Sequence, residues 1–309
     1  MKLKISNRVK GYLFAFIGVI AVSNVYIFSK AALNEVSMAQ FGTYWFAFGF
    51  LWNILFTIQQ KKIPTIKTFS KNQFLLLFTL GILEIGGTSF FFLAIHTVPN
   101  PAVVSFIGNI NPIFIAILGF IFLRERFNIP ELIGMSLALL GAFIISYRGG
   151  NIFKNIFIEG TDYIIISGFI YSFSTIIAKK NIHRIGPTIM SLNRTLHLSL
   201  FSIAVLWYSG QSIHISSNTL LNIIIGSTLG PFLASLAGYQ ALRYIEAGRA
   251  SVLGSSKGLF VLIGAFFYFG TFPQAHQIWG GLISILGVVL ISMGKVWSSK
   301  KTKKASKFL

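Results

Sequence analysis

Three ionisable side chains lie inside long apolar segments of this sequence. Glu84 lies in FTLGILEIGGTSFFFLA, Arg194 in GPTIMSLNRTLHLSLFSIAVLW and Lys257 in VLGSSKGLFVLIGAFF. A charge at the centre of a membrane helix costs about 2.5 to 3.5 kcal/mol, so such residues serve ion pairing, proton transfer or ligand binding. A carboxylate at this depth requires a cation or water beside it. Glu84 is therefore expected to pair with one of the two cations or to exchange a proton.

The composition indicates the solvent in which these charges lie. Of the 309 residues, 54% are hydrophobic and 11% are charged, whereas a soluble domain carries about 25% charged residues. The sequence has no cysteine, and its five histidines and seven acidic residues show no metal-ligand spacing. We expect an integral membrane protein without a metal or cofactor, in which the 32 phenylalanines form core and lipid-facing surface.

Ten apolar segments are long enough to cross a bilayer, since a spanning helix needs about 20 residues. The breaks between them are too short for a soluble domain. The predicted fold is an all-α membrane protein of ten transmembrane helices. Their predicted centres are Ile20, Phe48, Glu84, Ala116, Leu139, Ile170, Leu196, Ala234, Phe260 and Ser284.

The distribution of lysine and arginine predicts the orientation of these helices. Cytoplasmic loops carry the excess of Lys and Arg. With the N-terminus inside, 21 of the 26 basic residues fall on the cytoplasmic side. We therefore expect a multi-pass protein of the cell (inner) membrane with both termini cytoplasmic. The net charge of +19 then reflects topology and not nucleic-acid binding, and the basic tail contacts solvent or anionic lipid.

The second half of the sequence repeats the first. Lys30 matches Lys179 at a shift of 149 residues, and Gly134 and Gly141 match Gly280 and Gly287 at a shift of 146. The predicted units are residues 1–148 and 149–309, with five helices each. Because five is odd, the second unit has the opposite orientation in the membrane. Such inverted-topology repeats are common in secondary transporters, whose substrate site lies between the repeats near the midplane.

The stretches GNINPIFIAILGFIFLRERF, LIGMSLALLGAFII and QIWGGLISILGVVLIS resemble the EamA family of the drug/metabolite transporter superfamily. The resemblance covers essentially the whole chain and implies a carrier of small metabolites, such as amino acids and their derivatives, and in many cases an exporter. It also matches Arg194 to an arginine often found at that point of a repeat. The sequence departs from the pattern in having Phe260 and Pro273 where the first repeat has Pro112 and Glu125. Trp45 also stands where an arginine is frequent.

The depth of the three ionisable residues predicts one shared site. From the cytoplasmic ends of their segments, Glu84, Arg194 and Lys257 lie 10, 8 and 7 residues in, which corresponds to roughly 10 to 15 Å at 1.5 Å per residue. Lys257 lies among Gly and Ser residues, and its counterpart Asn109 lies beside Gly108, Asn111 and Pro112. Paired interruptions at matching points of two repeats point to a transporter site, although small residues also allow close helix packing.

The predicted substrate-binding residues share one property, which is a polar side chain at the level of this cavity. They are Lys257, Arg194, Glu84, Asn109, Asn111 and Tyr171. Glu84 and His197 are candidates for proton coupling. Each has a structural alternative: Glu84 as one half of a fixed ion pair, Arg194 in helix packing, and His197 as a hydrogen-bond donor to a carbonyl group. Tyr171, Ser174 and Thr175 form one polar stripe that can bind a solute or join helices.

These residues favour a secondary carrier for a small, carboxylate-bearing solute, acting as a monomer or homodimer. The alternatives are an intramembrane enzyme acting on a lipid-soluble substrate and a channel or scaffold protein. An enzyme requires a paired acid and base, a nucleophile set or a metal cluster at one depth, for which Glu84 and His197 are the candidates. A channel is expected to show pore-lining rings from several copies. The sequence has no Walker motif for direct use of ATP.

The predicted orientation is tested by cysteine labelling, because the parent sequence contains no cysteine. We expect single cysteines at Lys61, Arg124, Lys180 and Arg243 to react with an impermeant thiol reagent only from the cytoplasmic side. Labelling of Lys180→Cys from outside intact cells would show that the orientation is reversed.

Overall fold

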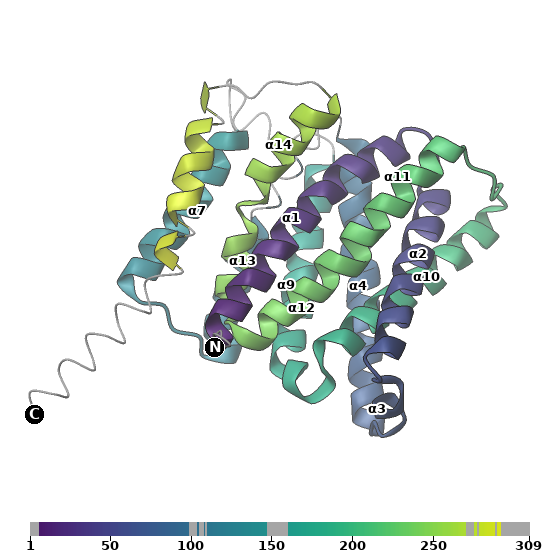
Figure 1. The fold of residues 1–309 in the computed structure, drawn as a ribbon, viewed down its shortest axis with the longest axis horizontal. Helices are drawn as coiled ribbons and strands as arrows, with labels where there is room; N and C mark the ends of the chain where they lie inside the picture. Colours follow the sequence, from purple (N-terminus) through teal and green to yellow (C-terminus); the bar gives the residue numbers. More distant parts are fainter. Residues whose placement is uncertain are drawn as a thin grey trace, which may run out of the picture.

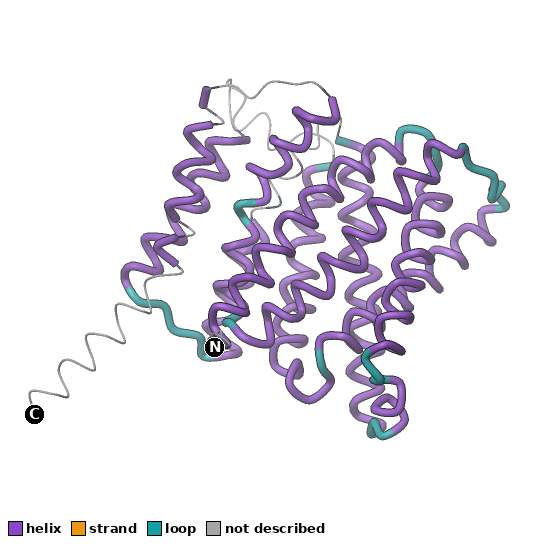
Figure 2. Tube along the Cα trace, viewed as in Figure 1, coloured by secondary structure: helices purple, strands orange, loops and turns teal. Residues whose placement is uncertain are grey.

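The computed structural model describes residues 6–98, 104, 108, 110–146, 160–269, 275–276, 278–287 and 289–291. The predicted site residue Asn109, the predicted boundary after residue 148 and the basic tail lie outside these residues. Within them, the chain consists of helices joined by short loops (Figure 2). This agrees with the predicted all-α class.

The first half of the chain begins with long helices and ends with shorter ones. The helices are α1 (Asn7–Leu33), α2 (Met38–Gln59), α3 (Ile63–Lys67), α4 (Lys71–Thr97), α6 (Ile110–Leu123) and α7 (Ile129–Ser146). Several begin at polar caps that the sequence provides. Ser37 and Gln40 form a capping box at the start of α2, and Asn128 and Glu131 form the same reciprocal pair at the start of α7. These contacts satisfy backbone amides that a helix leaves unpaired.

The second half contains two helices with interruptions. Its elements are α9 (Thr161–Ile185), α10 (Pro187–Ser209), α11 (Ser217–Ser227), the π-helix η1 (Thr228–Ala234), α12 (Ser235–Tyr244), α13 (Ala247–Gly254) and α14 (Lys257–Phe269). An apolar helix at Ile278–Ile291 follows in its described residues. The turn from α9 to α10 is sharp because Gly186 has a φ of 93°, which favours glycine, and Pro187 starts the next helix.

Helices of the two halves alternate in space instead of forming separate bundles. α1 packs against α12 and α14, α2 packs against α10, and α4 packs against α9. α7 lies beside Ile278–Ile291 at one end of the molecule, with α2 and α10 at the other (Figure 1). The buried core therefore lies mainly between the two halves.

The outer surface of the bundle is apolar. Large exposed hydrophobic side chains occur along α4 and α10, among them Phe74, Leu75, Phe78, Ile82, Leu200, Phe201 and Ile203. A surface of this kind is stable in lipid, where the helices satisfy their own backbone hydrogen bonds. The fold is that of a multi-pass membrane protein.

All ten predicted centres lie in helices, but only part of the predicted span count is supported. Five described helices are long and apolar enough to cross a membrane: Asn7–Leu33, Met38–Gln59, Lys71–Thr97, Pro187–Ser209 and Ser217–Tyr244. Shorter apolar helices include Ile110–Leu123, with 14 residues, and the predicted ninth span is divided into α13 and α14. The number ten stays a prediction.

Two lysines that match between the repeats make equivalent contacts. The Lys30 amine donates to the carbonyls of Ile95 and Val98 at 3.1 and 3.5 Å. The Lys179 amine donates to the carbonyls of Leu242 and Ile245, both at 2.6 Å. Each lysine thus caps the end of the third predicted helix of its own repeat, where carbonyl groups lack helical partners.

The contact between α7 and Ile278–Ile291 depends on glycines that match between the repeats. A Cβ atom at Gly141 would lie 2.4 Å from the amide nitrogen of Ser284 and 2.5 Å from the carbonyl oxygen of Gly280. A Cβ atom at Gly134 would lie 2.7 Å from the carbonyl oxygen of Gly287. The two backbones approach this closely only because side chains are absent.

We expect Gly141→Ala to destabilise the protein by roughly 1 to 3 kcal/mol, because the added methyl group must push the two backbones apart. Thermal unfolding in detergent measures the effect. Gly238→Ala is the matched control, since no atom lies within 4 Å of a Cβ built there. An equal melting temperature for Gly141→Ala and the parent would contradict the close contact.

Candidate functional site

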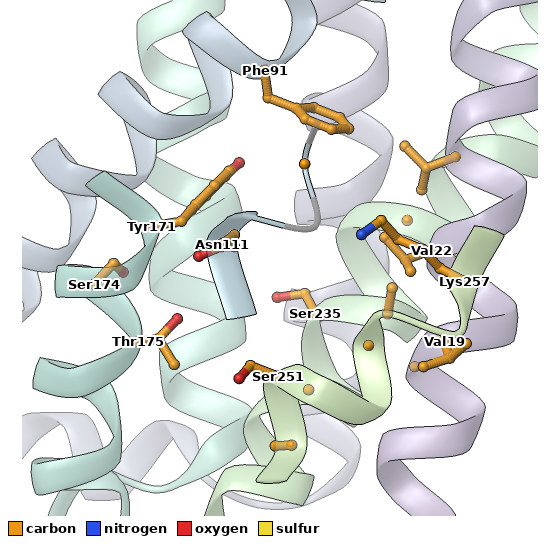
Figure 3. Close-up of a pocket in the computed structure, with 18 of the residues that line it drawn as sticks. Val19, Val22, Phe91, Asn111, Tyr171, Ser174, Thr175, Ser235, Ser251 and Lys257 are labelled. Carbon is orange, nitrogen blue, oxygen red and sulfur yellow. The ribbon is translucent and has the colours of Figure 1, made fainter. Parts of the chain in front are cut away.

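A cavity of about 400 Å³ lies between the two halves of the chain. In the first half of the chain, α1, α4 and α6 contribute side chains to its wall. In the second half, α9, α12, α13 and α14 do so. Figure 3 shows Tyr171, Ser174 and Thr175 of α9 facing Lys257 and Val22 across the space. The volume is in the range of small-molecule sites, which is about 300 to 1,000 Å³.

Glu84, which is buried, and Arg194, which is partly buried, form an ion pair in the wall of this cavity. The Arg194 Nε atom lies 2.6 Å from Glu84 Oε2. Ser174 donates to Glu84 Oε1, also at 2.6 Å, and Tyr239 is a further hydrogen-bonding neighbour of the carboxylate. The structure thus selects Arg194, and not Lys257, as the cation beside Glu84. Buried charges need such partners because they have lost their hydration.

The other end of the Arg194 guanidinium is held by two hydroxyl groups. Its Nη2 atom lies 3.4 Å from both Thr88 Oγ1 and the Tyr171 hydroxyl, which are 2.6 Å from each other. The Tyr171 ring lies against Gly87, where a Cβ atom would be 3.0 Å from the ring. The polar stripe on α9 therefore both holds the ion pair and faces the cavity.

Lys257 lies at a break between two helices. α13 ends at Gly254, and α14 begins at Lys257, so the Gly and Ser residues interrupt the helix as the sequence predicted. The carbonyl oxygen of Lys257 accepts a hydrogen bond from Ser23 Oγ at 3.1 Å. Its side chain extends toward the cavity from the wall opposite Tyr171 (Figure 3). Glu84, Arg194 and Lys257 therefore line one cavity.

Asn111 lines the same cavity from the start of α6. Its Oδ1 atom is buried and has no hydrogen-bond partner among the described residues. The side chain is held against α9, since a Cβ atom at Gly168 would lie 3.4 Å from the Cβ atom of Asn111. This amide is thus positioned to bind a polar group that enters the cavity.

His197 lies apart from these residues. Its Nδ1 atom is 2.9 Å from the carbonyl oxygen of Asn193, and its ring packs edge-on against Phe78. A Cβ atom at Gly81 would lie only 2.3 Å from the ring. His197 is not among the residues that line the cavity. Its observed contacts are those of the structural alternative, hydrogen bonding to a carbonyl group and packing.

Two features of the cavity wall were not predicted from the sequence. The aromatic residues were assigned to core and lipid-facing surface, yet Tyr26, Trp45 and Phe91 line the cavity. Trp45 fits because Gly226 leaves room, a Cβ atom there being 2.3 Å from the indole ring. The signal available in the sequence was Trp45 itself, a large apolar residue at a position where the family pattern often has arginine.

The second unpredicted feature is the π-helix η1, which contains Pro231. Proline has no amide hydrogen, so a wider helical turn accommodates it within an otherwise continuous helix. The Asn53 side chain donates to the carbonyl oxygen of Pro231 at 3.1 Å, and Gly230 and Pro231 line the cavity. The Gly-Pro pair at the centre of a predicted span was the available signal.

The described ranges contain no group of three or more His, Asp or Glu side chains arranged to hold a metal ion. Among the described lining residues, the polar side-chain groups are one carboxylate, one guanidinium, one amine, one amide, one indole and several hydroxyls. This set can bind charged and hydrogen-bonding groups of a small organic molecule.

Comparisons with known proteins place the chain among transporters. An uncharacterized transporter of Archaeoglobus fulgidus is 27% identical over 175 residues, which are 57% of this chain and 62% of that protein. The aligned region therefore spans less than two thirds of the archaeal relative. The uncharacterized transporter YyaM of Bacillus subtilis is 23% identical over 220 residues, covering 69% of this chain and 71% of that protein.

A solved crystal structure shares the fold. It has a TM-score of 0.73 at 13% identity and covers 91% of this chain and 95% of its own. The model of the EamA-like transporter family matches twice, over residues 9–147 and 160–293. These matches correspond to the two sequence repeats and confirm the family that the sequence resembles. The chain belongs to the EamA-like transporter family.

Proposed function

We propose that this membrane transporter is a secondary carrier that moves a small metabolite by alternating access. The observation that supports it best is the cavity between the two repeats, which contains an ion pair and a lysine at a helix break. Carriers built from repeats bind their solutes at such interfaces and near broken helices. Rocking of one repeat against the other would expose the cavity to one side at a time.

The charge of the cavity supports a solute with a carboxylate. Among the described lining residues, Glu84, Arg194 and Lys257 give a formal charge of +1 when all three are ionised. A cavity of low polarity whose ionised lining side chains sum to a positive charge favours a ligand that brings a negative group. An amino acid, an amino-acid derivative or another small organic acid fits this description. Its ammonium or hydroxyl group would meet Asn111, since Glu84 is already bound to Arg194 and Ser174.

The location and assembly follow from the same proposal. The carrier would work in the cell (inner) membrane with both termini in the cytoplasm and with lipid around its apolar surface. One chain contains the whole cavity, so a monomer would suffice, and a homodimer would contain two independent sites. The solute and the membrane lipids would be its partners, and nucleic acid would not be one.

Counterflow of radiolabelled solute in proteoliposomes tests the carrier. A panel of amino acids and small organic acids is supplied inside the vesicles, and uptake of the labelled compound against its gradient is measured. A carrier gives a transient accumulation, whereas a channel gives only equilibration and an enzyme gives a changed product. Equilibration without overshoot for every transported compound would contradict the carrier mechanism.

Glu84→Gln tests proton coupling. If the Glu84 carboxyl group exchanges a proton during the cycle, the variant should lose the pH dependence of net transport while keeping part of its solute exchange. Ser174→Ala is the matched control, because it removes one hydrogen bond to Glu84 and leaves the charge in place. A parent-like response of Glu84→Gln to an imposed pH gradient would assign Glu84 a structural role.

Lys257 variants test the charge of the solute. We expect Lys257→Met to weaken binding at least tenfold and Lys257→Arg to weaken it less, because only arginine keeps the positive charge. Binding to the purified protein is measured with matched compounds that carry or lack a carboxylate. Tightest binding by a permanently cationic compound, or unchanged binding by Lys257→Met, would contradict an anionic group on the solute.

A further inference from the structure

Glu125 joins the two repeats at the face of the bundle where α1 begins. It follows α6 and is buried, with 6% of its surface exposed. Its two carboxylate oxygens accept hydrogen bonds from the amides of Ala247 at 2.6 Å and Gly248 at 2.9 Å. These amides start α13, where the partial positive charge of a helix end favours a carboxylate. One acidic residue of the first repeat thus holds the start of a helix in the second.

The backbone around Glu125 is shaped for this contact. Arg124 has a φ of 54°, a left-handed conformation that is uncommon for residues other than glycine. A Cβ atom at Gly119 would lie 2.9 Å from Glu125 Oε2, and one at Gly248 would lie 3.1 Å from the same oxygen. The carboxylate therefore occupies a space between two glycines and fits only when α6 and α13 are together.

A second ionic contact lies beside the first. Arg249, with 1% of its side chain exposed, binds both oxygens of Glu131 at 2.7 and 3.0 Å. It also forms an ion pair with Glu246, and its guanidinium lies 5.5 Å from the centre of the Phe127 ring. Glu131 starts α7, so this pair again links the first repeat to α13. Two-point contacts between arginine and a carboxylate are among the strongest polar interactions in proteins.

These contacts lie between the cavity and one face of the molecule. Ala250 and Ser251, which lie within α13 shortly after these amides, line the cavity. The end of α12 lies against the beginning of α1, since a Cβ atom at Gly11 would be 2.6 Å from Ile245. In Figure 1 the N-terminus lies beside this junction. We call it the N-terminal face. Separating α13 from α6 and α7 would open the cavity toward it.

The repeats are unequal in this respect. Lys30 and Lys179 cap carbonyl groups at opposite ends of the bundle, so both repeats have this lysine contact with a helix end. The position that matches Glu125 in the second repeat is Pro273, which has neither a carboxylate nor an amide hydrogen. The second repeat therefore has no acid with which to hold the opposite face in the same way.

We propose that Glu125, together with the Arg249–Glu131 pair, forms a latch that closes the cavity toward the N-terminal face and must open in each transport cycle. This inference rests on the proposed carrier function and adds its gate. Because the second repeat lacks the acid, the latch favours the conformation that is closed at the N-terminal face. Weakening it shifts the population toward the conformation that is open at the N-terminal face.

A single cysteine at Ser251 reports the opening, since the parent sequence has no cysteine and Ser251 lines the cavity. Labelling by an impermeant maleimide is measured from each side of membrane vesicles. Lys180→Cys, measured in parallel, identifies the N-terminal face, because Lys180 follows the lysine that binds the end of α12. We expect Glu125→Gln to raise labelling from that side about tenfold and to lower it from the other side. The amide group of glutamine would oppose one of the two backbone amides.

Gly119→Ala tests the same latch without a change of charge, because its methyl group displaces the Glu125 carboxylate. It should move labelling in the same direction as Glu125→Gln. Glu35→Gln is the control, since Glu35 is hydrogen-bonded to Ser216 and Thr219 at the other face, and it should not raise labelling from the N-terminal face.

Two results would overturn the latch. One is a labelling rate within twofold of the parent for both Glu125→Gln and Gly119→Ala. The other is faster labelling from both sides, which would show loosened packing and not a gate. Failure of the counterflow experiment would count against the carrier itself. The labelling rates do not depend on that experiment, so the two failures are distinguishable.

Discussion

A carboxylate inside an apolar bundle must have a compensating charge, and the Glu84–Arg194 contact of 2.6 Å is the constraint around which the centre of this structure is arranged. Glu84 lies on α4 and Arg194 on α10, while Ser174 and Tyr171 of α9 complete the hydrogen bonds of the pair. The first repeat supplies the acid and the second supplies the base. The two repeats therefore cannot separate at this level without exposing a charge to hydrocarbon, which makes this level the natural pivot for any relative motion.

The irregular backbone of the second repeat lies beside the cavity. The break before Lys257 and the π-helix around Pro231 both line the cavity. Unpaired backbone groups are tolerated at membrane depth only beside protein or water. Side chains supply part of the missing hydrogen bonds, as Ser23 does for the carbonyl of Lys257 and Asn53 does for the carbonyl of Pro231. The irregular backbone segments of the second repeat and the cavity thus coincide.

Much of this organisation could be predicted, because charged residues and helix-breaking residues stand out within long apolar segments of a sequence. The depth of Glu84, Arg194 and Lys257 indicated a single cavity, and the Gly-Ser run indicated the break before Lys257. The choice of Arg194 as the partner of Glu84 could not be predicted, because it depends on the rotation of α4 and α10 about their axes. The cavity position of Trp45 was missed for a related reason: an aromatic side chain has the same composition signal whether it faces lipid, core or a ligand.

The contact that Glu125 makes could not be predicted from the sequence. Near the end of a predicted span, an acid next to two arginines is typical of a solvated loop, and only the structure places its carboxylate on the amides of Ala247 and Gly248. Two identical repeats would fold in the same way and make the same contacts at either face. A symmetric carrier would therefore have equal free energies with either face closed. Each contact present in one repeat alone changes that balance by its own interaction free energy. In the proposed carrier, the residues in which the repeats differ, and not those in which they agree, would therefore determine which face is closed at rest.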